Sequence, residues 1–203
     1  MIKSILPTPK SGQWLISFIS PTPEGAEYLG RNHRFVSTLA QFLVEEAITK
    51  GADARASRCG VIRTRAVTKV TTLYLLRLRF LIEQPGRTPQ LAEEVQVVGH
   101  GGLADEPEWL NETEVLALLE NARADANIDE AERRELVDSA LKAWPHLDSA
   151  IQKRVDQRAQ ALIESHRRIR QAVSLRVRGL SVVPQLPPDL LGLLVLQPLI
   201  GSS

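Results

Sequence analysis

The end of the chain carries the stretch that decides the fold: LDSAIQKRVDQRAQALIESHRRIRQAVSLRVR (147–178), then GLSVVPQLPPD (179–189), then LLGLLVLQ (190–197). The first segment predicts one long helix, because its apolar residues recur at helical spacing. These apolar residues are Ile151, Val155, Leu162, Ile169 and Val173. Gly179 is a residue type that commonly follows the last turn of a helix. The two segments after it predict two closing strands that return to a sheet.

The predicted long helix is strongly basic. It carries eight basic residues against three acidic ones, Asp148, Asp156 and Glu164. A row of arginines on one helix can follow phosphate groups, and each contact adds to an affinity that depends on salt. The alternative is a solvated helix face, or pairing with the acidic segment 105–138. The candidate nucleic-acid-binding residues of this helix are Arg158, Arg167, Arg168 and Arg170.

The composition is that of an ordinary globular chain. Its 203 residues are 43% hydrophobic and carry a net charge of +1, so any attraction to nucleic acid must come from local patches. Cys59 is the single cysteine, which excludes an intrachain disulfide framework and is typical of a reducing cytoplasm. No segment approaches the ~20 apolar residues of a membrane span. The sequence therefore predicts a cytoplasmic protein with no membrane partner.

The elements before residue 104 are predicted to be mostly strands. Segments 14–20, 58–67, 71–83 and 91–98 are rich in β-branched and alternating apolar residues. We expect the last three to form an antiparallel meander, because their connections are short. A helix is predicted from Asn32, as its cap, to about Lys50. His100 lies in a glycine-rich segment that we expect to be an exposed loop ending the sheet.

Two further helices are predicted between the sheet and the long basic helix. Asn111 with Glu114, and Asp129 with Glu132, have the spacing of helix N-caps, which predicts helices 111–124 and 130–143. The order sheet, helices, sheet predicts an α+β fold, with an antiparallel sheet packed on helices. We expect one domain over 1–203, in which 1–104 is mostly sheet with one helix, 105–178 is helical and 179–203 forms the closing strands.

Motifs that would indicate an enzyme are missing or incomplete in the sequence. The DEAE stretch (129–132) resembles a helicase magnesium box, but the chain lacks a glycine-rich phosphate loop with Lys and Ser/Thr. Asp125, Asn127 and Asp129 match only the start of a calcium loop. The four histidines lie far apart, without metal-ligand spacing. We therefore expect no catalytic residue, no metal and no cofactor.

A second basic set lies on the predicted strands 58–67 and 71–83. Because side chains alternate along a strand, Arg63 and Arg65 share one face, and Arg77 and Arg79 share another. Such a face can bind phosphate, or it can be the hydrated side of a one-sided sheet. We take Arg63 and Arg65 as further candidates for nucleic-acid binding.

Three segments resemble the C-terminal region of RapA-like helicases, which are Swi/Snf-type superfamily II ATPases of bacteria. NHRFV (32–36), leading into a helix, resembles the His-Pro-Leu-Val helix that follows the motor in this family. The run 63–80 resembles the accessory β-region after it. The helix 159–170, with VPQLPPD (183–189) and the terminal apolar strand, resembles the end of such proteins. The likeness covers nearly the whole chain in pattern and order.

The resemblance implies a non-catalytic accessory module of an ATP-dependent helicase whose motor is on the same or a separate chain. The module would position DNA, RNA or a partner for that motor. The alternative is a protein-docking module, for example to RNA polymerase or to the motor, that never contacts nucleic acid. A third hypothesis is a small-molecule enzyme with a site near His100, which would require a polar pocket with converging carboxylates.

Overall fold

The computed structural model describes residues 13–172 and 179–199, except for 31, 51–53 and 55–56, and only the backbone of 169–172. The chain divides into two compact units, residues 1–58 and 59–203, where the sequence predicted a single domain. Strands and helices together make a mixed α+β fold, as predicted.

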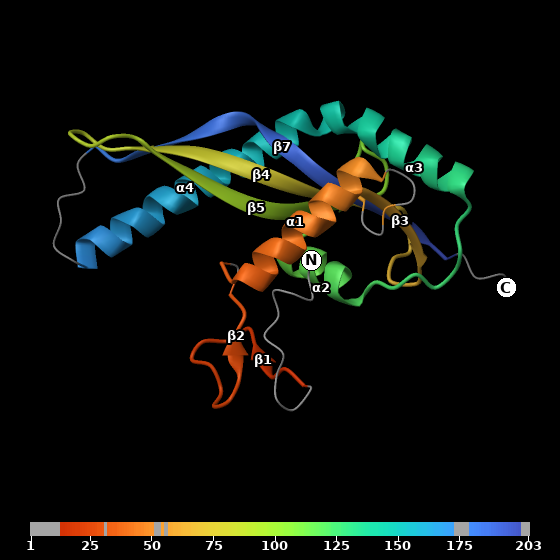
Figure 1. The fold of residues 1–203 in the computed structure, drawn as a ribbon. Helices are drawn as coiled ribbons and strands as arrows, with labels where there is room; N and C mark the ends of the chain where they lie inside the picture. Colours follow the sequence, from red (N-terminus) through yellow and green to blue (C-terminus); the bar gives the residue numbers. More distant parts are fainter. Residues whose placement is uncertain (1–12, 31, 51–53, 55–56, 173–178, 200–203) are drawn as a thin grey trace. The chain divides into compact units, whose positions relative to one another are not determined.

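The larger unit is built on a five-stranded sheet (Figure 1). The strand order is β3-β7-β4-β5-β6, and all neighbours are antiparallel except β3 and β7. The strands are β3 (Cys59–Thr64), β4 (Thr71–Glu83), β5 (Gln90–Gly101), β6 (Glu108–Trp109) and β7 (Ser181–Pro198). The two predicted closing segments are continuous as β7, with register shifts against β4 near Leu76 and Arg77.

The position of β7 corrects the predicted meander. β7 lies between β3 and β4, so these two strands are not neighbours. Its apolar run is consistent with this central position, because the Leu193–Leu196 end packs into a cluster on each face of the sheet. Leu193 pairs with Tyr74 and Leu194 with Leu73, so consecutive β7 residues pack on opposite faces.

Three helices and a short 3₁₀ turn complete the larger unit. They are α2 (Glu112–Asn121), α3 (Glu130–Ala143), the turn Trp144–Leu147 and α4 (Asp148–Ala172). The predicted caps are confirmed: the Asn111 side chain accepts a hydrogen bond from the Glu114 N–H, and Asp129 accepts one from Glu132. The residues 173–178, predicted to continue α4, lie outside the described part of the chain.

One face of the sheet carries the main core. Tyr74, Leu76, Leu78 and Phe80 alternate along β4 and are at most 3% exposed. They form one cluster with residues of α3, the 3₁₀ turn and α4. The helix residues of this cluster are Ala140, Leu147, Ile151, Val155 and Ala159. The helical spacing seen in the sequence of α4 is therefore the spacing of its buried stripe.

The opposite face of the sheet is covered only in part. At one end, Leu73 and Leu196 pack on Val115 of α2. Beyond that end, the face carries exposed apolar residues around a group of ion pairs. We call this the open sheet face; its residues are Leu75, Arg77, Arg79, Leu81, Leu91, Glu93, Val95, Val183 and Asp189.

His100 lies inside β5, which corrects the expected exposed loop. β5 continues through Gly101, and His100 is only 3% exposed. Its ring packs between Tyr74, at 5.9 Å between centroids, and Trp109, at 5.7 Å. Gly99 and Gly101 lie within the strand at closely packed places: a Cβ at Gly99 would meet Leu73 at 2.4 Å, and one at Gly101 would meet Lys69 at 3.0 Å.

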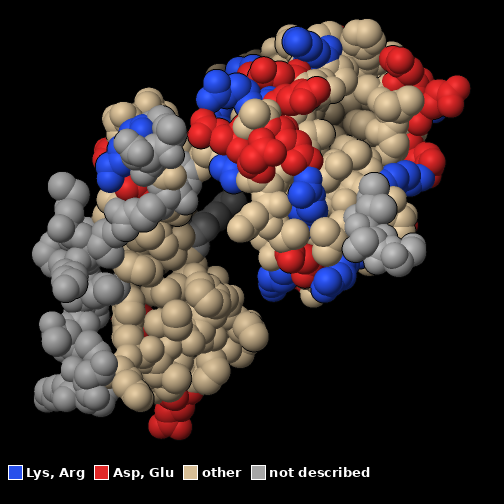
Figure 2. Space-filling view, turned by 90° about the vertical axis from the view of Figure 1, so that its right-hand side faces the viewer, with Lys and Arg blue, Asp and Glu red and all other residues tan. Residues whose placement is uncertain are grey.

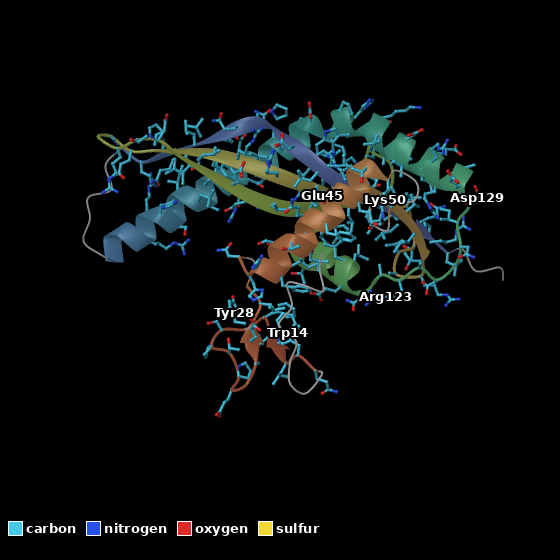
Figure 3. The ribbon with its side chains drawn as sticks, in the orientation of Figure 1. Trp14, Tyr28, Glu45, Lys50, Arg123 and Asp129 are labelled. Atoms are coloured by element: carbon cyan, nitrogen blue, oxygen red, sulfur yellow. The ribbon has the colours of Figure 1, made fainter. Side chains whose placement is uncertain are left out.

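The smaller unit contains a pair of short parallel strands and one helix. β1 (Ile16–Ser17) pairs with β2 (Glu27–Tyr28), and α1 spans Arg34–Thr49. Figure 3 labels Trp14 and Tyr28 beside these strands. The cap of α1 is His33, not Asn32: its Nδ1 accepts a hydrogen bond from Phe35 N–H at 3.2 Å. Glu27 accepts one from Trp14 Nε1 at 2.7 Å and lies 3.1 Å from His33 Nε2, so these contacts orient the cap.

Candidate nucleic-acid interface

Arg158, in the middle of α4, binds a carboxylate of the sheet. Its Nε and a terminal nitrogen donate hydrogen bonds to the two oxygens of Glu94, at 2.6 and 2.8 Å. These hydrogen bonds raise the pKa of Arg158 above its ordinary value. One turn earlier, Arg154 lies 4.5 Å above the Trp109 ring centre, a cation–π distance. Both arginines therefore hold α4 against the sheet.

Arg63 is likewise engaged inside the protein. Its guanidinium donates to Glu132 of α3 and, at 3.2 Å, to the carbonyl of Asn127. Its own carbonyl accepts the N–H of Asp125 at 2.9 Å. These contacts attach the end of β3 to the segment that leads into α3. A phosphate at Arg63 would have to compete with the Glu132 carboxylate.

Arg65 follows β3 and is exposed. Its backbone N–H donates to Asp125 at 2.7 Å, while no carboxylate within the described residues pairs with its guanidinium. Figure 2 views the molecule from the side of β3 and α3 in Figure 1, and basic and acidic side chains lie intermixed there. The charged side chains on this side are therefore of both signs, and the view of Figure 2 shows no continuous basic patch there.

The distal half of α4 presents the accessible arginines. Arg167 is 50% exposed and donates to Glu164, three residues before it on the same helix, at 2.7 Å. Arg168 is exposed too. An exposed ion pair within one helix contributes about 0–1 kcal/mol, so Glu164 holds Arg167 only weakly. The side chain of Arg170 lies outside the described part of the chain.

Arg77 and Arg79 share one carboxylate on the open sheet face. Arg77 donates twice to Asp189, at 2.8 and 2.6 Å, and Arg79 donates once, at 3.2 Å. The hydrogen bond from Arg77 is the main reason that the pKa of Asp189 is lowered. The common face of Arg77 and Arg79 is thus confirmed. Their partner escaped the sequence analysis, because the pairing of β4 with β7 joins residues about 110 positions apart.

The two sets of candidate residues lie apart. In Figure 1, β3 and the C-terminal end of α4 are at opposite ends of the larger unit. Arg63 and Arg65 therefore do not extend the surface formed by Arg167 and Arg168. We define the α4 arginine surface as Arg167, Arg168 and, by its sequence position, Arg170. Arg63 and Arg158 donate to carboxylates of other elements, whereas Arg167 pairs within its own helix and Arg168 is exposed.

Three further findings concern metal binding, the surroundings of His100 and the length of the helices. Within residues 13–172 and 179–199, apart from the gaps, no three His, Cys, Asp or Glu side chains gather closely enough to hold a metal ion. A cavity does lie beside His100, but its lining includes no Asp or Glu. The helices described here include none with the length and apolar character needed to cross a membrane.

Comparison with known proteins gives a family without an assigned function. A family model described as a domain of unknown function, DUF8741, matches residues 45–203. Neither the curated proteins nor the solved structures contain a significant match to the chain. The match covers the whole larger unit and begins in the second half of α1.

Proposed function

The chain belongs to the DUF8741 family of domains of unknown function, and from the geometry of its own residues we propose that it is a non-catalytic accessory module that holds nucleic acid. The contact is made by the α4 arginine surface with the phosphate backbone. The motor that the module serves is a Swi/Snf-type helicase ATPase on the same or a separate chain. This last part rests on the resemblance of the segments 32–36, 63–80, 159–170 and 183–189, with the terminal apolar strand, to RapA-like helicases.

One observation carries the proposal: arginines of the same helix differ in the carboxylates that hold them. Arg158 is bound at both ends of its guanidinium by Glu94, whereas Arg167 has one exposed partner and Arg168 is exposed on the distal half. Arginine binds phosphate through a planar fork of donors, and exposed arginines form this contact at little desolvation cost. Placed on a rigid helix, they would fix the path of a backbone without reading its sequence.

The test is fluorescence anisotropy of the full chain with labelled single- and double-stranded DNA and RNA across a salt series. We expect binding that weakens steeply with salt. The variant Arg167→Glu, Arg168→Glu, Arg170→Glu should lose most of the affinity. For duplex DNA, the slope of log K against log salt should fall by about 0.9 for each phosphate contact that is lost.

A matched variant separates local contact from net charge. Arg133, Arg134 and Lys142 are exposed on α3, and changing all three to Glu alters the net charge by the same amount. This control should retain more of the affinity than the α4 variant. Equal losses in both variants would contradict a local site. Flat anisotropy at low salt, with a folded chain, would overturn nucleic-acid binding altogether.

A second candidate function is protein docking, and the open sheet face is the observation that favours it. Leu91 and Val95 are 60% and 61% exposed, and Val183 is 41% exposed. Exposed apolar side chains gathered on one sheet face are typical of surfaces that contact another protein. A helicase motor or RNA polymerase would then be the partner. If a folded chain does not bind nucleic acid, protein docking remains as the proposed function.

A further inference from the structure

A cavity of 320 Å³ lies between the sheet and α3, beside the ends of β4 and β5. Thr72, Tyr74 and His100 contribute to it from the sheet, and Ser139 and Ala143 from α3. Leu103, in the loop after β5, also lines it. The cavity is separate from the α4 arginine surface, since none of its lining residues belongs to α4.

Polar atoms are buried in the lining of this cavity. Tyr74 is 0%, His100 3% and Thr72 6% exposed. The Tyr74 hydroxyl lies 3.5 Å from His100 Nε2, which is at the limit of a hydrogen bond. Among the described residues, no group meets full hydrogen-bond geometry with His100 Nδ1, although the backbone of Gly101 lies close enough to the ring to oppose part of the lowering of its pKa. Most buried polar groups in proteins are paired, so an unpaired imidazole nitrogen beside a cavity indicates a place for a bound group.

The His100 ring is held in a fixed orientation. Tyr74 stacks on it, with an angle of 21° between the rings, and Trp109 meets it edge-on at 64°. Tyr74 in turn contacts Trp144, with 5.0 Å between ring centroids. Aromatic packing on several sides leaves the imidazole little freedom to turn. A ligand would therefore find a preformed polar group rather than one that must be ordered on binding.

The cavity is suited to an uncharged molecule. No Asp, Glu, Lys or Arg lines it. Burial lowers the pKa of His100, so the imidazole is neutral near pH 7, and burial raises the pKa of Tyr74 to about 12, so the phenol keeps its proton. A charged ligand would lose its hydration here without gaining a partner of opposite charge.

Two exposed residues of different polarity are among those that line the cavity. Leu103 is 79% exposed, although it lines the cavity together with buried residues. Ser139, across from the sheet on α3, is exposed as well. A bound molecule would cover part of Leu103, and removing that apolar surface from water favours binding.

We propose that this cavity binds a small, uncharged aromatic molecule with one hydroxyl or ring N–H group. The aromatic body lies against the apolar lining, and the polar group bonds to the His100–Tyr74 pair. The volume of 320 Å³ lies at the lower end of the range of ligand sites, which is consistent with one or two rings. This inference is independent of nucleic-acid binding, since it uses none of the arginines of α4.

The first experiment uses phenol as the probe and the full chain at pH 7. In ¹H–¹⁵N NMR spectra we expect saturable shifts at His100, Leu103 and Ser139, with a dissociation constant on the order of 1 mM. Benzoate, the charged counterpart, should not shift the same signals. A folded chain whose spectrum is unchanged by phenol would overturn the proposal.

Two variants localise the binding. Ala143→Leu should fill the cavity and weaken phenol binding by about tenfold or more, whereas Ala131→Leu, at an exposed position of the same helix, should leave it unchanged. His100→Phe keeps a ring but removes its nitrogens, so the preference for phenol over toluene should disappear. Each variant is first checked for native circular dichroism. Equal weakening by both leucine variants, or an unchanged preference in His100→Phe, would contradict the proposed site.

Discussion

Arg158 and Arg167 occupy the same helix and each contacts one glutamate, yet their surroundings differ. Glu94, the partner of Arg158, is 24% exposed and belongs to the sheet, while Glu164 is 53% exposed and belongs to α4 itself. A bidentate pair between two elements fixes their relative position, whereas a pair within one turn fixes only two side chains. At the residue scale, the position and exposure of the glutamate partner therefore distinguish an arginine that holds the helix on the sheet from one that is accessible.

The Arg158–Glu94 pair is expected to stabilise the larger unit. Glu94→Gln should lower the free energy of unfolding by about 1 kcal/mol, because Arg158 is itself 39% exposed and water weakens the attraction. Glu164→Gln, as the comparison, should change it by less than about 0.5 kcal/mol. Urea unfolding followed by circular dichroism measures both values. Similar effects in the two variants would contradict the structural role of Arg158.

His100 should make stability depend on pH. Its folded pKa lies below that of the unfolded chain, because burial penalises the charged imidazole. Below about pH 6.5 the unfolded chain therefore binds more protons than the folded protein, so the free energy of unfolding falls as the pH is lowered.

His100→Gln tests this dependence, because glutamine does not titrate. Denaturant unfolding between about pH 7.5 and 5.5 should give a flatter dependence in the variant than in the natural chain. The matched change is His146→Gln, at an exposed position of the 3₁₀ turn. If the two variants had the same pH dependence, the burial of His100 would not be its cause.

At the element scale, β7 organises the larger unit. It is 18 residues long and pairs with β3 on one side and β4 on the other. Its end carries Leu193, Val195 and Leu196, which are at most 5% exposed. A strand near the end of the chain thus pairs with β3 and β4, which lie much earlier in the sequence. Formation of the sheet must await this long-range pairing, which raises the entropic cost of ordering the chain.

Leu196→Ala tests the central position of β7. Leu196 is fully buried between Leu73 and Val115, so the change should lower the free energy of unfolding by about 2–5 kcal/mol through lost contacts and a cavity. Val183→Ala, at an exposed position of the same strand, should cost less than about 1 kcal/mol. Thermal and urea unfolding provide the comparison. A small effect at Leu196 would be inconsistent with the burial of this end of β7.

At the scale of the whole molecule, both apolar clusters lie within the larger unit. The residues that form them fall between Cys59 and Leu196. The smaller unit exposes several large apolar residues, including Phe18 at 70% and Ile19 at 72%. A unit that contains its own core is expected to fold without the rest of the chain.

The prediction at this scale concerns truncation. A protein of residues 59–203 should keep its helical and strand signals in circular dichroism and unfold in one cooperative transition. The expectation follows from the pairing of β7 with β3 and β4, both of which lie after residue 58. Loss of cooperative unfolding in the truncated protein would show that residues 1–58 contribute to the core.

The sequence by itself determined the elements whose signals are local. β4 has the predicted bounds, 71–83, and α2 and α3 begin at the predicted caps Asn111 and Asp129. Alternation, helical spacing and capping act over a few residues, so they can be read without knowledge of distant partners. The basic character of residues 166–168 was likewise visible, and among the described residues Arg167 and Arg168 are exposed while His166 is half-buried.

The tertiary structure alone decided what depends on distant partners. Three features join segments more than 20 residues apart. β7 lies between β3 and β4, and His100 is buried against Tyr74. Arg63 donates to Glu132, and Arg158 donates to Glu94. A sequence pattern shows that an arginine is present, but the electrostatic energy of that arginine depends on the charge that folding brings beside it. The division of the arginines into structural and accessible ones therefore followed from the packing of the sheet against its helices.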